Sequence, residues 1–211
     1  MNYGNQDRRD RLRDAAVAVL ADAGGRGLTH RAVDAAADVP LGTAKNYFPT
    51  RDALLRAVAE RCVEQYRALA ALLAGSGPGP ADRAGLAALL AGLLRDVSGP
   101  GRPRMVAYLE LQSEATRRPW LAALLDPIAA SDFAAYGQLL RTAGMPSGPE
   151  QARALTLALH GAVLHLLTGA PGTLAAAGLD DLDAFARAAL ASVCPEGREG
   201  CEGRDPKEGE A

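Results

Sequence analysis

The stretch LTHRAVDAAADVPLGTAKNYFPTRDALL, residues 28–55, decides the fold of the N-terminal part of the chain. Thr29 precedes a run whose apolar positions share one helical face, so its hydroxyl is expected to cap a helix of about two turns. A turn is expected at residues 37–39. Pro40 suits the first position of a second helix, because its missing N–H would be unpaired there in any case. The stretch therefore predicts two short helices joined by a tight turn.

The second of these helices is predicted over residues 41–48. Ala44 and Phe48 are four residues apart in the sequence and are expected to point inward. The outward face then carries hydrogen-bond donors and no acidic side chain: Thr43, Lys45, Asn46 and Tyr47. Thr50 is expected to cap a third, longer helix, with Arg51 beside the cap. A helix-turn-helix presents such a second helix to the major groove of DNA, while caps and flanking cations hold phosphates.

These residues resemble the pattern of the tetracycline-repressor (TetR) family of bacterial transcriptional regulators. That pattern comprises a Thr-led helix, a small-residue turn, Val, Gly-Thr, an aromatic residue, Phe, Pro or Ser, Lys or Arg, an acidic residue and Leu-Leu. The chain matches it with Thr29, Ala36, Val39, Gly42, Thr43, Phe48, Pro49, Thr50, Arg51, Asp52, Leu54 and Leu55. Two positions differ: the turn glycine is Asp38, which tolerates a left-handed conformation, and the tyrosine after Gly-Thr is Lys45. The aromatic residue has moved to Tyr47, and these changes concern the base sequence recognised rather than the mode of binding.

By motif position, the resemblance implies base contacts from four side chains: Arg31, Thr43, Lys45 and Asn46. It implies phosphate contacts from five more: Thr29, His30, Tyr47, Thr50 and Arg51. The implied function is a DNA-binding transcriptional regulator, expected to be a repressor that a ligand releases. One such helix covers only a few base pairs, so two copies are expected to bind a pseudo-palindromic operator of double-stranded DNA as a homodimer.

The remaining sequence predicts helices throughout. Ala, Leu and Arg are abundant and only 4% of residues are aromatic, which favours helices over strands. A first helix is expected over residues 7–23, ended by Gly24 and Gly25. Apolar spacing predicts further helices over residues 50–75, 82–97, 104–117, 150–168 and 180–193, and one that Pro119 and Pro127 precede and that reaches residue 143.

The predicted fold class is therefore all-α. A three-helix helix-turn-helix head over residues 1–50 precedes a body of about six helices over residues 51–194, which would bind ligand and dimerise. Residues 195–211 are charged, rich in glycine and without large apolar groups, so they are predicted to be disordered. In the body, residues 108–119 (YLELQSEATRRP) look like a sequence of many actinobacterial members of the TetR family.

The helix over residues 150–168 is too apolar to lie exposed. With the helix over residues 180–193 it is expected to form a four-helix bundle across a two-fold axis, with Gly161 allowing close approach. The family keeps a cavity among the body helices, and a mostly apolar small molecule is the expected effector. Candidate ligand-binding residues are Tyr108, Glu114, Trp120, Tyr136 and His160. The alternative is that these side chains belong to the core, as aromatic residues and lone histidines on apolar helices often do.

Composition by itself does not indicate DNA binding. The formal net charge is −2, and without the charged tail the chain has 20 basic and 19 acidic residues. Near the N-terminus, four arginines alternate with aspartates: Arg8, Arg9, Arg11 and Arg13. They form either a helix face with internal ion pairs or an arm that binds phosphates, and the spacing leaves both open.

No catalytic motif was found: the sequence has no Gly-x-Ser-x-Gly, no phosphate-binding loop and no His-Glu-x-x-His. We therefore predict no enzyme activity, no cofactor and no metal site. The three cysteines suit a reducing cytoplasm, and the longest apolar run is too short to span a bilayer. The alternative function is a helical dimerisation or adaptor protein whose head no longer binds DNA.

Overall fold

The structure is a computed structural model that describes residues 3–75 and 79–195. The described residues form ten α-helices and no β-strand, which confirms the all-α prediction. The helices are α1 (Tyr3–Gly27), α2 (His30–Ala36), α3 (Thr43–Tyr47), α4 (Arg51–Gly75), α5 (Arg83–Ser98), α6 (Arg102–Ala115), α7 (Pro119–Thr142), α8 (Pro149–Thr168), α9 (Pro171–Ala176) and α10 (Leu182–Val193).

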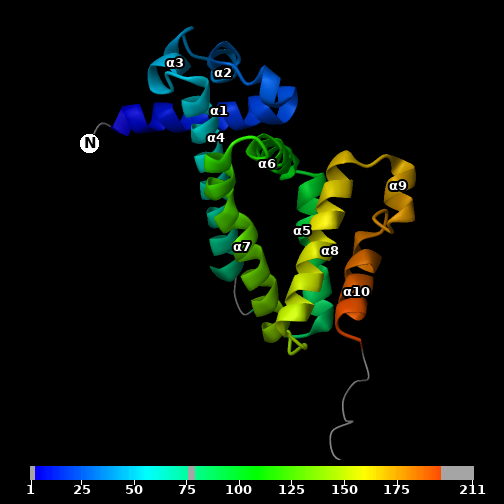
Figure 1. Cartoon of the computed structure of the whole chain (residues 1–211). Coiled ribbons are helices and arrows are strands. Elements are labelled where there is room, and N and C mark those ends of the chain that lie inside the picture. Colours follow the sequence, from blue (N-terminus) through cyan, green and yellow to red (C-terminus); the bar gives the residue numbers. More distant parts are fainter. Residues whose placement is uncertain (1–2, 76–78, 196–211) are drawn as a thin grey trace, which may run out of the picture.

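Helices α1, α2 and α3 form the head at one end of the molecule (Figure 1). Helix α4 leaves the head and continues into the body without a break, where it runs beside α7. Helices α5, α8 and α10 pack together on the other side of the body, and α7 meets α8 at the end far from the head. Helix α6 lies directly beneath α1, so head and body are in contact along α1 as well as through α4.

Two hydrophobic clusters hold these helices together. The head cluster contains buried side chains of α1 to α4, together with Leu111 of α6 and Leu121, Leu125 and Ile128 of α7. The body cluster joins α5, α8 and α10 with the second half of α7, where Leu140 is fully buried. Helix α7 therefore takes part in both clusters, and its middle turns lie between them.

The second helix of the motif begins later than predicted. Residues 41 and 42 form a turn, α3 starts at Thr43, and Gly42 is its N-cap with φ of 90°. The prediction that Pro40 opens this helix is wrong, because two hydrogen bonds from the backbone of Gly42 and Ala44 to a buried carboxylate fix the turn first. The first helix also starts earlier than predicted, and Gly24 interrupts it with a φ of 65° before its last turn.

Two further differences concern the body. Pro127 lies inside α7 rather than before it, because its neighbours Leu125 and Ile128 are buried in the head cluster and their packing offsets the lost hydrogen bond. Helix α9 lies between the predicted helices over residues 150–168 and 180–193, where no helix was predicted, and Pro171 opens it at the first helical position. The predicted disorder of residues 195–211 concerns a segment that, apart from Pro195, lies outside the described residues.

Candidate functional site

Asp34 fixes the turn between α2 and α3. Its side chain is almost completely buried, with 1% of the residue exposed. Oδ2 accepts a hydrogen bond from the Gly42 N–H at 2.7 Å, and Oδ1 accepts one from the Ala44 N–H at 2.6 Å. A carboxylate thus satisfies N–H groups that the start of α3 would otherwise leave unpaired, at the helix end where negative charge is favourable. Asp34 was not among the predicted site residues. The sequence feature that could have indicated its role is the position of a carboxylate directly after the buried Val33, on the inner face of α2.

The turn itself requires two left-handed residues. Asp38 has a φ of 52°, the one positive φ of a non-glycine residue in the described part of the chain, and Gly42 has a φ of 90°. The expectation that Asp38 replaces the family's turn glycine in a left-handed conformation is therefore confirmed. Its N–H donates to the carbonyl oxygen of Ala35 at 3.2 Å, which closes the end of α2.

The structure keeps part of the predicted base-contact face free. Lys45 and Asn46 are exposed on α3, Arg31 is exposed on α2, and none of the three has a side-chain hydrogen bond within the described residues. Thr43 is half-buried and its hydroxyl donates to the Pro40 carbonyl oxygen at 2.5 Å. The α3 surface therefore presents one cation and one amide with no competing partner.

Most of the side chains that were predicted to contact phosphates form hydrogen bonds with the backbone of the head. Thr29 accepts from the Ala32 N–H at 3.1 Å and Thr50 from the Ala53 N–H at 3.0 Å, so both are helix caps as predicted. The His30 Nε2 donates to the Phe48 carbonyl oxygen at 2.5 Å. Arg51 donates to the carbonyl oxygens of Leu28, at 2.8 Å, and Gly25. Tyr47 is half-buried, and its hydroxyl donates to Asn5 of α1. These side chains hold the head together as well as lying at its surface.

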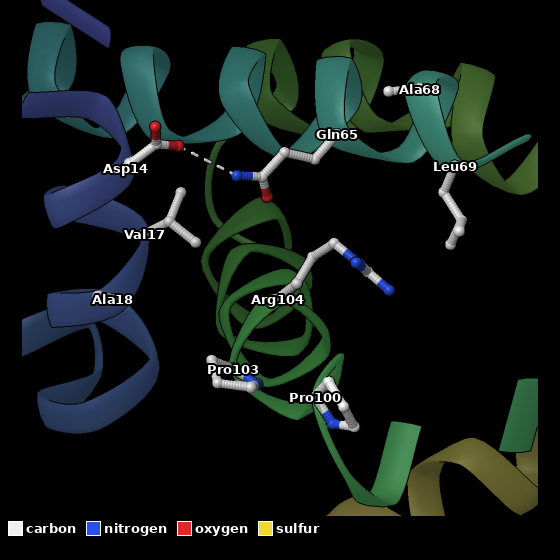
Figure 2. Close-up of a pocket in the computed structure, with 9 residues that line it drawn as sticks. All are labelled: Asp14, Val17, Ala18, Gln65, Ala68, Leu69, Pro100, Pro103 and Arg104. Carbon is white, nitrogen blue, oxygen red and sulfur yellow. Dashed lines mark hydrogen bonds between the residues drawn. The ribbon is translucent and has the colours of Figure 1, made fainter. Parts of the chain in front are cut away.

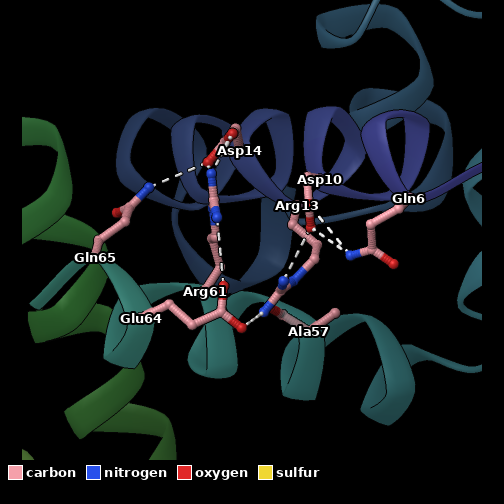
Figure 3. A network of polar contacts seen from close by, with 8 residues as sticks. All are labelled: Gln6, Asp10, Arg13, Asp14, Ala57, Arg61, Glu64 and Gln65. Carbon is pink, nitrogen blue, oxygen red and sulfur yellow. Dashed lines mark hydrogen bonds and ion pairs between the residues drawn. The ribbon is translucent and has the colours of Figure 1, made fainter. Parts of the chain in front are cut away.

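The arginines of α1 have different roles. Figure 3 shows Arg13 reaching from α1 to α4, where it donates to the Ala57 carbonyl oxygen at 3.4 Å and pairs with Glu64 at 2.6 Å and with Asp10 at 3.1 Å. Burial alone would lower the pKa of Arg13, but the two carboxylates raise it above its ordinary value. Arg61 of α4 pairs in return with Asp14 of α1 at 2.7 Å.

Arg11 donates to the carbonyl oxygen of Ala37 at the end of α2, at 3.0 Å. Arg9 lies over the Phe48 ring, 5.7 Å from its centre. Of the two interpretations of these arginines, ion pairs within the protein therefore apply to Arg13. Arg11 instead stabilises the backbone of the helix-turn-helix. Arg8 is exposed and has no side-chain hydrogen bond within the described residues.

Three of the five predicted ligand-binding residues gather around Asp132, in the part of α7 between the two hydrophobic clusters. The Tyr66 hydroxyl donates to Oδ1 of Asp132, and the His160 Nε2 lies 2.9 Å from Oδ2. Burial and the charge of Asp132 raise the pKa values of Tyr108 and Tyr136 above that of a free tyrosine. Asp132 and Tyr66 were not predicted, since no local pattern connects residues 66 positions apart.

Glu114 and Trp120 lie elsewhere, at the junction of head and body. Glu114 pairs with Arg117 at 3.3 Å and with Arg118, whose Nε is also 3.6 Å from Asp52 of α4. The Trp120 ring packs against the head cluster, and the Arg56 guanidinium lies 4.5 Å from its centre. Glu114 and Trp120 therefore have arginine partners at this junction, and neither contacts Asp132 or His160 through a hydrogen bond or ion pair within the described residues.

Two surface grooves have volumes of about 510 Å³ each, and the lining of the second includes Phe133, which follows Asp132 in the sequence. The first, between α1, α4 and the start of α6 (Figure 2), is lined by Asp14, Val17, Ala18, Gln65, Ala68, Leu69, Pro100, Pro103 and Arg104. The second is lined by Phe133, Ala134, Pro149, Ala152 and Arg153. Neither groove is lined by a predicted ligand-binding residue.

Within residues 3–75 and 79–195, no group of three or more His, Cys, Asp or Glu side chains could hold a metal ion. None of the helices over these residues combines the length and the apolar character needed to cross a membrane.

The three-helix head, with its rigid turn and a polar α3 face free of acidic residues, defines a helix-turn-helix protein. Residues 81–196 match the family described as tetracyclin repressor-like, C-terminal domain. The multidrug binding protein EbrR in complex with ethidium is 35% identical over 89% of this chain and 99% of that one, with a TM-score of 0.61. EbrR structures with imidazole and with proflavin are similar as well.

A TetR-family member from Streptomyces coelicolor A3 is 34% identical over 89% of this chain and 98% of its own, with a TM-score of 0.61. A transcriptional regulator from Rhodococcus sp. Rha1 shares the fold at 22% identity, with a TM-score of 0.68 over 88% of this chain and 95% of its own. No curated protein sequence matches the chain. The chain belongs to the TetR family, and it is a DNA-binding transcriptional regulator rather than an enzyme.

Proposed function

We propose that two copies of the chain bind a pseudo-palindromic DNA operator, and that a small organic molecule releases them from it. The observation that carries the DNA part is the fixed α3, whose exposed Lys45 and Asn46 have no partner within the described residues. With Arg31 and Thr43 they would contact bases, while Thr29, His30, Tyr47, Thr50 and Arg51 would lie against phosphates. We place this activity in the cytoplasm.

The exposed face of α8 supports a homodimer. Leu157 and Leu164 lie seven residues apart on that face, with 62% and 45% of each residue exposed. Gly161 lies between them, and a side chain there would have no atom within 4 Å, so a second helix has room to approach closely. With α10, which packs beside α8, this face suits a four-helix bundle between two chains. Such a dimer would hold its two α3 helices about 34–36 Å apart on DNA.

Selection of random duplexes by the purified protein tests the DNA part and yields the operator. Lys45→Ala and Asn46→Ala should each change the tolerated bases, at about 1–3 kcal/mol for a good bidentate contact. Arg67→Ala removes an exposed cation of α4 outside the head and should leave base preference unchanged. Retention on DNA should fall steeply with salt because phosphate contacts release counterions. An adaptor with an inactive head would show neither selection nor this salt dependence.

The dimer is tested by sedimentation of a variant with charge on the α8 face. Leu157→Asp places a carboxylate where two apolar faces would meet, and it should give monomers at concentrations at which the unaltered chain is dimeric. Glu150→Gln, at the exposed start of α8, is the matched control. A monomer for the unaltered chain at micromolar concentration would refute the dimer.

For the effector, we propose a mostly apolar aromatic molecule that carries a positive charge. Asp132 supplies one carboxylate, and Tyr66, Tyr108 and Tyr136 supply aromatic rings near it, an arrangement that attracts organic cations. His160 would orient the ligand through its bond to Asp132. The complexes of EbrR with ethidium and proflavin support this chemistry. Glu114 and Trp120, at the junction of head and body, would transmit the change to α4 rather than hold the molecule.

Thermal stabilisation by ethidium and proflavin, followed by release of the selected operator, tests the effector. The ligand must bind the DNA-incompetent state more tightly, since only a difference in affinity can shift the equilibrium. Asp132→Asn and His160→Ala should weaken stabilisation and release while operator affinity without ligand stays unchanged. Equal stabilisation of the Asp132→Asn variant by both dyes would rule out this site.

A further inference from the structure

Leu41 is an exposed apolar side chain in the head. It has 71% of its surface exposed, more than Leu157 and Leu164, which are the other large exposed hydrophobic residues in the described part of the chain. Those two belong to the α8 face proposed for dimerisation. Leu41 lies at the opposite end of the fold, in the turn before α3, and the head cluster contains no part of it. Folding therefore does not explain why a leucine occupies this position.

The backbone on both sides of Leu41 is fixed. The Thr43 N–H and hydroxyl both donate to the Pro40 carbonyl oxygen, at 3.1 and 2.5 Å. The Gly42 N–H donates to the buried Asp34 carboxylate at 2.7 Å. Leu41 is thus held in a rigid turn, which projects its side chain to solvent before any partner arrives. An apolar side chain on a rigid backbone loses little conformational freedom when it binds a partner.

The neighbours of Leu41 indicate what it contacts. Lys45 and Asn46 on α3 are exposed polar groups that suit hydrogen-bonding base edges, and Leu41 precedes the same helix by two residues. In the major groove the C5-methyl group of thymine is the apolar feature of a base edge, and apolar side chains contact it. We propose that Leu41 recognises a thymine methyl group in each operator half-site. This inference rests on the proposed operator binding and adds a specificity-determining residue to it.

The test removes the methyl group from the DNA. Once the operator has been selected, each thymine is replaced in turn by uracil, which keeps every hydrogen-bonding group and lacks only the C5-methyl. At one position per half-site we expect affinity to fall about fourfold, the fold-change that corresponds to one buried methyl-sized group. Leu41→Ala should bind the thymine and uracil operators equally at that position, and Leu41→Met should retain the difference.

Two controls make the outcome specific. Lys45→Ala should lower affinity for both operators and keep the thymine-to-uracil ratio, because it lies outside the methyl contact. The midpoint of thermal unfolding of Leu41→Ala should match that of the unaltered chain, since an exposed side chain is removed. If an operator is selected but uracil at every position is neutral, or if Leu41→Ala keeps the same ratio, the Leu41 contact is wrong while operator binding stands. If no operator is selected, the proposed function and this inference both fail.

Discussion

Two carboxylates, one in the head and one in the body, differ in the kind of partner that they bind. Asp34 is buried and binds two backbone N–H groups, eight and ten residues further along the chain. Asp132 is partly buried and binds two side chains, Tyr66 and His160, which come from α4 and α8 and lie 66 and 28 residues away. The first contact is local and has backbone partners. The second is distant and has side-chain partners.

This difference separates a fixed part of the molecule from an adjustable one. The Ala44 N–H at the start of α3 is buried, so without the Asp34 carboxylate this group would lack a partner in the folded protein. The Tyr66 hydroxyl and the His160 imidazole can instead rotate to bind another acceptor, or a ligand can displace them from Asp132. We infer that the head keeps one geometry and that the region around Asp132 is where the body can respond.

Asp34→Ala is expected to have the largest effect. It leaves the N–H groups of Gly42 and Ala44 without a partner, at about 1–3 kcal/mol for each donor. The midpoint of thermal unfolding should fall, and operator binding should be lost even where the chain remains folded, because α3 no longer holds its position. The Asp34→Asn variant keeps one acceptor, so its unfolding midpoint and operator affinity should lie between those of the unaltered chain and of Asp34→Ala. Asp22→Ala, an exposed aspartate of α1, is the control. An Asp34→Ala variant with unchanged operator affinity would remove the distinction drawn between the two carboxylates.

Arg13→Met is expected to have the second largest effect on stability, because Arg13 binds both a backbone group and side chains. It binds the backbone carbonyl of Ala57 and two carboxylates, with 6% of the residue exposed. Loss of these bonds should reduce the free energy of unfolding by about 2 kcal/mol, since Glu64 is left at the surface where water can solvate it. Arg61→Met is the matched variant in the same network, and its more exposed ion pairs should account for less than about 1 kcal/mol. Urea unfolding of both variants measures the difference, and equal losses would contradict it.

The same contrast explains which parts of the fold the sequence predicted. The caps by Thr29 and Thr50 and the burial of Ala44 and Phe48 depend on neighbours within one or two helical turns, so spacing identified them. The start of α3 was predicted wrongly because it depends on Asp34, whose role requires a contact across the turn. Spacing shows that a residue is near a helix end, but it does not show which carboxylate reaches that end.

The candidate sites follow the same rule. Lys45 and Asn46 could be placed on an exposed face from helical periodicity alone. The residues of the proposed ligand site could not be assembled, because α4, α7 and α8 meet only in the folded chain. The prediction named Tyr108, Tyr136 and His160 but not Asp132, which hydrogen-bonds His160, and it included Glu114 and Trp120, whose partners are arginines. A half-buried carboxylate on α7 had no local feature that set it apart from other aspartates.

Asp132→Asn should have a smaller effect on stability than either head variant. The amide keeps an acceptor for the Tyr66 hydroxyl and loses the charge beside His160, so we expect the free energy of unfolding to fall by about 1 kcal/mol. Operator binding without ligand should be unchanged, as the contact lies far from α3. Urea unfolding and operator titration test both points together. Loss of operator binding in a folded Asp132→Asn variant would show that this region also belongs to the fixed part of the molecule.

The smallest expected effect concerns the pH dependence of the contact between α1 and α4. Burial by itself would raise the pKa of Glu64, but hydrogen bonds and charges from Arg13 and Arg61 hold that pKa below its ordinary value. A carboxylate with a lowered pKa stabilises the fold at pH values above its unfolded pKa, about 4.3, and this stabilisation is lost as the pH falls through the folded pKa.

Glu64→Gln should therefore be less stable than the unaltered chain at pH 7, and the two should converge as the pH is lowered below about 4. The Glu64 side chain is 48% exposed, so solvent screening keeps the difference at neutral pH below about 1 kcal/mol. Urea unfolding at pH 7 and at lower pH measures it, with Glu150→Gln at the exposed start of α8 as the control. A difference that grows toward acid pH would mean that Glu64 is not held by these arginines in solution. The contact between α1 and α4 would then depend on Arg13 and the Ala57 carbonyl, a backbone partner like those of Asp34.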